Sequence, residues 1–354
     1  MITYLPRLHM CATHHICDLM FCEHRYRQRN FYMMTTKTIS FGLLLSCWFV
    51  LSDAATVETR IGEIQGHKTQ SGLVEFLGIP YARPPVGKLR FKRPRPMIGF
   101  SKTFHASMFG PSCIQHKYTK DKNDHNNRQS EDCLTLNIWT KQKYIDDAHN
   151  ENTETSLRPV IVQIHGGDLM SGSSQDLKDA SISLATKGNV VISLNYRLNV
   201  FGFLTLKALS DESPRLLSGN YGLHDCLAAL RFINGNVIRF GGDPQNVLLI
   251  GSHTGGSIVY ALLSSPLSEG LFAKAIAVNG APRLNSTVVE AQQVWHKQVL
   301  ENTMCGDKKY SLSKEIVSCL RELSTKDLLL SMPSLSLRKV DKYSISNIFA
   351  NGHI

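Results

Sequence analysis

A short glycine-bounded segment, Gly251-Ser-His-Thr-Gly255, has the residue types and spacing of a reactive turn. The apolar run Val247–Ile250 precedes it and a helix-like apolar stretch follows, so the segment joins a strand to a helix. Glycines at its ends allow a sharp turn, and a serine at the centre of such a turn attacks a carbonyl carbon in acyl transfer. Here the central residue is His253. We therefore predict that the turn forms and that its nucleophile is missing.

Two serines close to the turn are poor substitutes for that nucleophile. Ser252 lies one residue too early, and we expect its side chain to face away from a substrate. Ser257 belongs to the following helix. His253 itself would form an acyl-imidazole only with an acid–base partner and a formed oxyanion site. An alternative nucleophile is the less favoured interpretation, and it stays open at this point.

A second segment, His165-Gly-Gly-Asp168, follows an apolar run and resembles the oxyanion loop of type-B carboxylesterases. The resemblance implies that backbone N–H groups of Gly166, Gly167 and Thr254 donate to a developing negative charge. The carboxylate of Asp168 would oppose that charge if it faced the site. The alternative is that Asp168 turns outward and caps a local turn.

Continuous β-branched runs, rather than alternating ones, predict strands that are covered on both faces. They occupy residues 160–164, 190–194 and 247–250, and residues 273–278 are predicted to form the next strand. Apolar residues at helical spacing predict helices over residues 223–240 and 257–263. This alternation predicts an α/β fold with a mostly parallel central sheet and helices on both faces.

The remaining segments carry weaker signals. Residues 79–96 are rich in proline and are predicted to be extended rather than helical. Residues 116–130 and 141–158 are polar and are predicted to be surface loops. Residues 287–303 and 311–330 are predicted to be helices that flank a cysteine loop.

Sequence blocks that follow one another in order resemble type-B carboxylesterases and cholinesterases. They are Phe76–Gly87, Leu89–Phe91, Glu131–Asn137, His165–Gly167, Asn195–Leu198, Gly202–Leu204, Asn220–Leu223 and Phe240–Pro244. The resemblance covers residues 56–354, and it implies the α/β-hydrolase fold and an ion pair between Arg90 and Glu131. It also implies that active relatives carry serine where this chain has His253, and glycine where it has Asp168.

In that family the acid and the histidine of the catalytic triad follow the nucleophile in chain order. The histidines after the turn, His296 and His353, do not match the family's catalytic histidine, and no segment matches its acid loop. We therefore expect the α/β-hydrolase domain to be incomplete at its C-terminus in this chain. Family members dimerise through helices that would lie beyond residue 354, so a dimer is expected only with that region.

Two close pairs of cysteines, Cys113 with Cys133 and Cys305 with Cys319, are predicted to close local loops as disulfides, which the resemblance also implies. Each loop would contribute roughly 3 kcal/mol in a chain-entropy model. Cys226 lies in an apolar helical stretch and is predicted to be a buried free thiol. The zinc-binding spacings Cys-x-x-Cys and His-x-x-x-His do not occur, and neither does a nucleotide or flavin motif, so we expect no metal and no cofactor.

The N-terminus has the layout of a secretory signal. Residues 38–51 form an apolar run that Lys37 precedes and small residues follow, so we assign 33–55 to a signal peptide. A buried core helix is the alternative. Residues 1–32 are then expected to be an upstream extension without a structural role. Export predicts a secreted or cell-surface protein in an oxidising compartment, with a glycosylation sequon at Asn285.

The formal net charge of +10 is spread along the chain, apart from a short cluster between Lys88 and Arg95. A nucleic-acid-binding protein would gather its cations on one motif or stripe, so we expect no nucleic-acid partner. The surface is expected to be basic and solvated.

The resemblance and the missing serine together indicate a non-catalytic member, similar to the group that includes neuroligins, gliotactin, glutactin and neurotactin. Those proteins keep the hydrolase fold and present its surface to partners, which predicts extracellular recognition or adhesion with a protein partner. One alternative is a secreted binding protein that holds a small apolar ligand in the former gorge. Another is a carboxylesterase that hydrolyses carboxylic esters with a Ser-His-acid triad, if the sequence is faulty at position 253.

Overall fold

The computed structural model describes residues 54–116, 128–150, 157–280, 288–307, 309 and 311–332. The chain divides into two units, Met1–Ser52 and Asp53–Ile354, and all described residues belong to the second. The predicted upstream extension and nearly all of the predicted signal peptide therefore lie outside the described residues.

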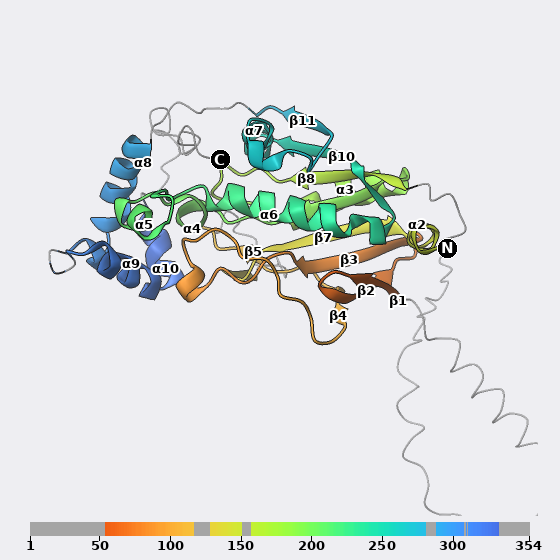
Figure 1. Cartoon of the computed structure of the whole chain (residues 1–354), viewed down its shortest axis with the longest axis horizontal. Coiled ribbons are helices and arrows are strands. Elements are labelled where there is room, and N and C mark those ends of the chain that lie inside the picture. Colours follow the sequence, from red (N-terminus) through yellow and green to blue (C-terminus); the bar gives the residue numbers. More distant parts are fainter. Residues whose placement is uncertain are drawn as a thin grey trace, which may run out of the picture. The chain divides into compact units, whose positions relative to one another are not determined.

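A mixed sheet forms the centre of the described part of the chain (Figure 1). Its strand order is β1-β2-β3-β7-β9-β8-β10-β11, with the short β4 beside β2. The strands are β1 (Ala54–Thr59), β2 (Gly62–Lys68), β3 (Leu73–Pro80), β4 (Phe104–His105), β7 (Thr135–Lys141), β8 (Arg158–Ile164), β9 (Val190–Leu194), β10 (Gly242–Ser252) and β11 (Lys274–Val278). Neighbours from β9 through β8 and β10 to β11 pair parallel, whereas β1, β2, β3, β7 and β9 pair antiparallel in turn. The predicted α/β class is confirmed.

The apolar runs of β8 and β9 are buried on both faces, as predicted. Along β10, next to the edge strand β11, Val247 and Leu249 are buried but Leu248 and Ile250 are only half-buried, so the prediction is wrong for one face of that strand. Every residue of β9 is buried. Along β8, Val160 and Val162 belong to the largest apolar cluster, whereas the intervening Ile161 belongs to a smaller one. Since successive side chains of a strand point to opposite faces, the two clusters lie on opposite sides of the sheet.

Helices cover both of these faces. The helix α6 (Tyr221–Asn236) contributes Leu223 and Leu227 to the largest cluster, and α7 (Thr254–Leu263) contributes Ile258. The helix α3 (Lys178–Thr186) contributes Ala185 to the smaller cluster, together with Trp139 of β7. The two predicted helices of this region are confirmed.

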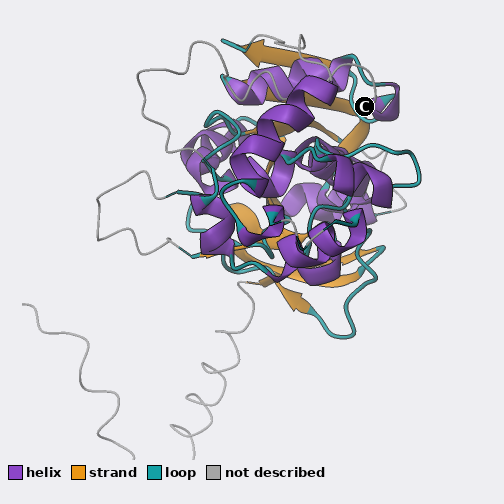
Figure 2. Cartoon of the chain, turned by 90° about the vertical axis from the view of Figure 1, so that its left-hand side faces the viewer, coloured by secondary structure: helices purple, strands orange, loops and turns teal. Residues whose placement is uncertain are grey.

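A second group of helices gathers at one end of the sheet, at the left of Figure 1 and facing the viewer in Figure 2. It comprises α4 (Asn199–Phe203), α5 (Lys207–Glu212), α8 (Val288–Trp295), α9 (Ser313–Glu322) and α10 (Thr325–Leu330). Val200, Leu209, Leu320 and Leu328 share one apolar cluster there. The helices predicted over 287–303 and 311–330 are confirmed within the described residues.

Two expectations about irregular segments need correction. Residues Gln142–His149 form the helix α2 rather than a loop. This polar segment holds two buried residues, Tyr144 and Ile145, and the guanidinium of Arg158 lies 4.5 Å from the Tyr144 ring centroid. Those contacts fix a helix that its polar composition hides. Within the proline-rich stretch, a short 3-10 turn at Gly87–Leu89 interrupts the extended chain.

Candidate functional site

The predicted turn lies where β10 ends and α7 begins, with His253 between them. Its backbone has φ 51° and ψ −120°, a region that side-chain-bearing residues rarely adopt. The N–H of His253 donates to the carbonyl of Val278 at 2.8 Å, and its own carbonyl accepts from the N–H of Ser257 at 3.2 Å. The His253 side chain is exposed. The turn thus presents a side chain at its centre, and that side chain is an imidazole.

The glycines of the turn are required by close backbone contacts. A Cβ atom added to Gly255 would lie 2.3 Å from the carbonyl oxygen of Ile164. A Cβ atom on Gly251 would lie 2.3 Å from the carbonyl carbon of Gly255. Only glycine permits this approach of strand to helix. Steric contacts in the fold therefore explain why glycine stands at positions 251 and 255.

The loop after β8 lies directly beside His253. A Cβ atom added to Gly166 would lie 3.0 Å from the carbonyl oxygen of Ser252 and 3.5 Å from the Cβ of His253. Gly167 has φ 105°, and its carbonyl accepts from two N–H groups further along the loop. The fold therefore brings the candidate oxyanion loop and the turn together, as the sequence predicts.

Asp168 and Thr254 bond to each other across this site. The backbone N–H of Asp168 donates to Oγ1 of Thr254 at 2.8 Å, and the hydroxyl donates in turn to Oδ1 of Asp168 at 3.2 Å. Asp168 is exposed and has φ 56°. The Thr254 hydroxyl therefore holds the Asp168 carboxylate beside the turn. The N–H of Asp168 is thus satisfied by the side chain of Thr254.

His165 supports the loop as a neutral residue. Burial lowers the pKa of His165 to about 4, although its bond to the Gly166 carbonyl acts in the opposite direction. Because that carbonyl only accepts, Nδ1 is the protonated nitrogen of the pair at 2.8 Å. The ring stacks on Tyr196 at 4.4 Å, and the Tyr196 hydroxyl donates to the His165 carbonyl at 3.0 Å. His165 therefore positions backbone groups and is not a general base near neutral pH.

A buried ion pair anchors the segment that follows β9. Nε and Nη2 of Arg197 each donate to the Asp225 carboxylate at 2.7 Å, and the Arg197 backbone N–H donates to it at 3.1 Å. The side chain of Asp225 is fully buried and that of Arg197 is nearly so. This pair links the β9 end to α6, and sequence analysis did not identify it.

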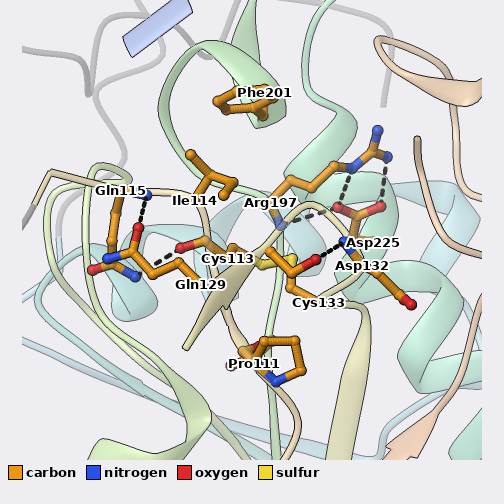
Figure 3. Close-up of a disulfide and its surroundings, with 12 residues drawn as sticks. Pro111, Cys113, Ile114, Gln115, Gln129, Asp132, Cys133, Arg197, Phe201 and Asp225 are labelled. Atoms are coloured by element: carbon orange, nitrogen blue, oxygen red, sulfur yellow. Dashed lines mark hydrogen bonds and ion pairs between the residues drawn. A yellow bond between two sulfur atoms is a disulfide. The ribbon is translucent and has the colours of Figure 1, made fainter. Parts of the chain in front are cut away.

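The ion pair lies beside a disulfide, as Figure 3 shows. Cys113 and Cys133 form this bond, and Cys305 and Cys319 form a second one, so both predicted disulfides are confirmed. Cys226 is the free buried thiol of the described residues, again as predicted.

The ion pair between Arg90 and Glu131, which the family resemblance implies, is present as well. Arg90 donates to both carboxylate oxygens of Glu131, at 2.7 and 2.5 Å. Nη1 of Arg90 also donates to the carbonyl of Leu323 at 2.7 Å, so the pair ties the proline-rich stretch to the segment after α9. The contact with Leu323 was not anticipated from sequence.

Several predicted residues lie outside what the structure describes. The side chains of His296 and His353 are not described, nor is Asn285. In the described ranges no group of three His, Cys, Asp or Glu side chains could hold a metal ion. Within the same ranges no helix is long and apolar enough to span a bilayer.

Residues 53–352 match the Carboxylesterase family, and this chain belongs to that family. Its relatives include acetylcholinesterase-1 of Trittame loki, 37% identical over 279 residues, and carboxylesterase 3B of Mus musculus, 37% identical over 287 residues. These alignments cover 76% and 77% of this chain but 48% and 47% of the relatives. The chain therefore spans about half the length of the relatives it matches.

The solved structures agree with this assignment. A PNB esterase superposes with a TM-score of 0.66 at 34% sequence identity, over 80% of this chain and 54% of that chain. The fold is accordingly the α/β-hydrolase fold of the family. The relatives named above are esterases by name, and this chain differs from the serine-centred turn by carrying His253.

Proposed function

We propose that this protein is a non-hydrolytic carboxylesterase-family member that acts in extracellular recognition of a protein partner. The observation that carries the proposal is the exposed imidazole of His253 at the central position of the turn between β10 and α7. A turn of this kind presents the side chain of its central residue to a substrate. Here that side chain is an imidazole and carries no hydroxyl oxygen.

The size of the expected loss is large. Removing the nucleophilic serine of subtilisin lowers kcat by about 2 × 10⁶. That factor corresponds to about 8–9 kcal/mol of transition-state stabilisation. Binding of the ester and any remaining N–H donors do not compensate for a deficit of this size.

The contact between Thr254 and Asp168 supports the same conclusion independently. An oxyanion is stabilised by N–H groups that are free to receive it. The Thr254 hydroxyl holds the Asp168 carboxylate at 3.2 Å, and the backbone N–H of Thr254 is one of the expected donors. A developing negative charge at those donors would therefore meet the Asp168 carboxylate.

An extracellular location agrees with the two disulfides, because such bonds persist in oxidising compartments. A stable fold that has lost ester hydrolysis can still bind a partner through its surface. Hydrolysis of a carboxylic ester is the second candidate, favoured by the names of the relatives.

Ester hydrolysis separates the two candidates. Purified protein is assayed with p-nitrophenyl acetate and p-nitrophenyl butyrate beside the variants Ser252→Ala and His253→Ala, with His105→Ala as the matched exposed control. We expect the same slow, unsaturable rate from all four proteins. Saturable turnover that either turn variant abolishes and His105→Ala retains would contradict the proposal.

Recognition has its own test. Beads coated with the glycosylated, disulfide-bonded protein are mixed with cells before and after mild trypsin treatment of the cell surface. We expect saturable binding that trypsin removes. Absence of saturable binding, or binding that survives trypsin, would contradict a protein partner while leaving the hydrolysis result unaffected.

A further inference from the structure

A cavity of about 520 Å³ lies between the end of the proline-rich stretch and the segment that joins α5 to α6. Its lining shares no residue with the turn at 251–255 or with the loop at 165–168. This volume is within the range of small-molecule sites in proteins. Whatever the cavity binds is therefore a question separate from the chemistry at His253.

The lining is strongly cationic. Lys92, Arg93 and Arg95 line the cavity, and Glu212 is the acidic residue among its lining residues. The charge of Glu212 is already compensated, because Arg321 donates to both of its oxygens at 2.9 and 2.6 Å and Lys92 lies 3.2 Å away. An excess of positive charge remains on the wall.

The two arginines of the wall have no carboxylate partner among the described residues. No ion pair there involves Arg93 or Arg95, and both residues are exposed. Partial burial, followed by the charge of Arg215, lowers the pKa of Arg93. Cations held close together without an anion make a region that attracts one.

The N-terminus of α6 adds to this field. Gly219, Asn220 and Tyr221 line the cavity, and they bracket the start of this 16-residue helix. Asn220 makes no side-chain capping bond, and no acidic residue stands in the first turn. The positive end of the helix dipole therefore has no acidic side chain of the first turn beside it, and such a charge stabilises a helix start.

One residue of the cavity wall is a largely buried histidine. His224 of α6 lines it and is 7% exposed. Burial, and then the charges of Arg93 and Arg197, lower the pKa of His224 to about 3. A neutral imidazole thus lies among cations, where it can donate a hydrogen bond to an anion without competing for a proton.

Apolar groups complete the wall. Pro94, Leu217 and the ring-bearing Tyr221 line the same cavity. We infer that this cavity binds a small organic anion, with its carboxylate or sulfonate held by Arg93, Arg95 and the start of α6. The apolar body of the ligand packs against the proline, leucine and tyrosine side chains.

Titration with 1-naphthalenesulfonate by isothermal calorimetry tests this site on the whole protein, with 1-naphthalenemethanol as the uncharged analogue. We expect saturable 1:1 binding of the anion that weakens between about 50 and about 500 mM NaCl, as screening requires. The double variant Arg93→Gln, Arg95→Gln should weaken it at least about tenfold. Arg239→Gln, which removes an exposed arginine elsewhere, should not change it.

A second measurement needs no variant. Phenylglyoxal modifies accessible arginines, and peptide mass analysis reads each site. Bound 1-naphthalenesulfonate should protect Arg93 and Arg95 and leave Arg239 reactive. Equal affinity for the uncharged analogue, equal affinity in the double variant, or no protection at saturating probe would overturn the inference. None of these outcomes depends on whether the protein hydrolyses esters.

Discussion

The N–H of Asp168 and the hydroxyl of Thr254 are 86 residues apart in sequence and bonded at 2.8 Å in the fold. This bond joins the loop after β8 to the first residue of α7. It therefore fixes the two backbone segments that would surround a tetrahedral intermediate. It also accompanies the bond that holds the Asp168 carboxylate beside Thr254, whose backbone N–H is an expected donor to such an intermediate.

Replacing Thr254 by alanine should cost about 1 kcal/mol in the free energy of unfolding, because the N–H of Asp168 loses its partner and the carboxylate loses a donor. Urea denaturation of Thr254→Ala beside Thr254→Ser measures the cost. The serine variant keeps the hydroxyl and should match the parent protein. Equal losses in both variants would show that the methyl group, not the hydrogen bond, matters.

The steric role of Gly255 predicts a larger effect. Gly255→Ala places a Cβ 2.3 Å from the Ile164 carbonyl oxygen, so strand and helix must separate, at about 3 kcal/mol or more. Gly235→Ala, within α6, is the matched control. Its added Cβ would lie 3.2 Å from Nη1 at the flexible end of the Arg60 side chain. That change should stabilise the helix by up to about 1 kcal/mol. Thermal unfolding of the two variants distinguishes them, and similar midpoints would refute the steric account.

Asp225→Asn should be strongly destabilising. It leaves the buried guanidinium of Arg197 without a counter-charge, which costs about 3–5 kcal/mol in comparable pairs. Asp211→Asn removes an exposed ion pair with Lys207 and should change little. Urea midpoints measure both changes. A mild effect of Asp225→Asn would mean that water or another anion reaches Arg197.

His165 predicts a loss of stability in mild acid. Its pKa is about 4 in the folded protein and about 6.5 when unfolded, so above pH 6.5 both states are neutral and the residue adds no pH dependence. Between pH 6.5 and 4 only the unfolded state takes up the proton. The free energy of unfolding therefore falls as pH falls through this window, by about 3 kcal/mol in total.

The variant His165→Phe keeps a ring against Tyr196 and removes the titrating group. Between pH 6.5 and 4.5 its free energy of unfolding should fall less steeply than that of the parent. The two slopes should differ by close to the uptake of one proton on unfolding. The exposed His105→Gln should leave the slope unchanged. Parallel slopes for the parent and His165→Phe would show that His165 is not held neutral.

Sequence patterns predicted the parallel half of the sheet because β8, β9 and β10 carry continuous apolar runs. Val190–Leu194 is predicted and observed with the same bounds. The turn was predictable because Gly251 and Gly255 form a known spacing around His253. This pattern and the apolar runs are local in sequence, although the contact that requires glycine at position 255 is with the distant Ile164 carbonyl.

Other features depend on tertiary contacts and left no comparable signal. The strand β1 alternates buried and exposed residues, but its alanines and threonines have too little contrast to reveal it. The helix α2 is fixed by the contact of Tyr144 with Arg158. The bond from Asp168 to Thr254 and the pair Arg197–Asp225 join distant segments, so no spacing in the sequence indicates them.

Covalent trapping tests the central claim most directly. The protein is incubated with a fluorophosphonate that labels activated serine nucleophiles, and peptide mass analysis then covers residues 251–257. Because the turn places an imidazole where a serine hydroxyl would attack, we expect no phosphonylated residue in this peptide. A stoichiometric adduct on Ser252, His253 or Ser257 would contradict the account.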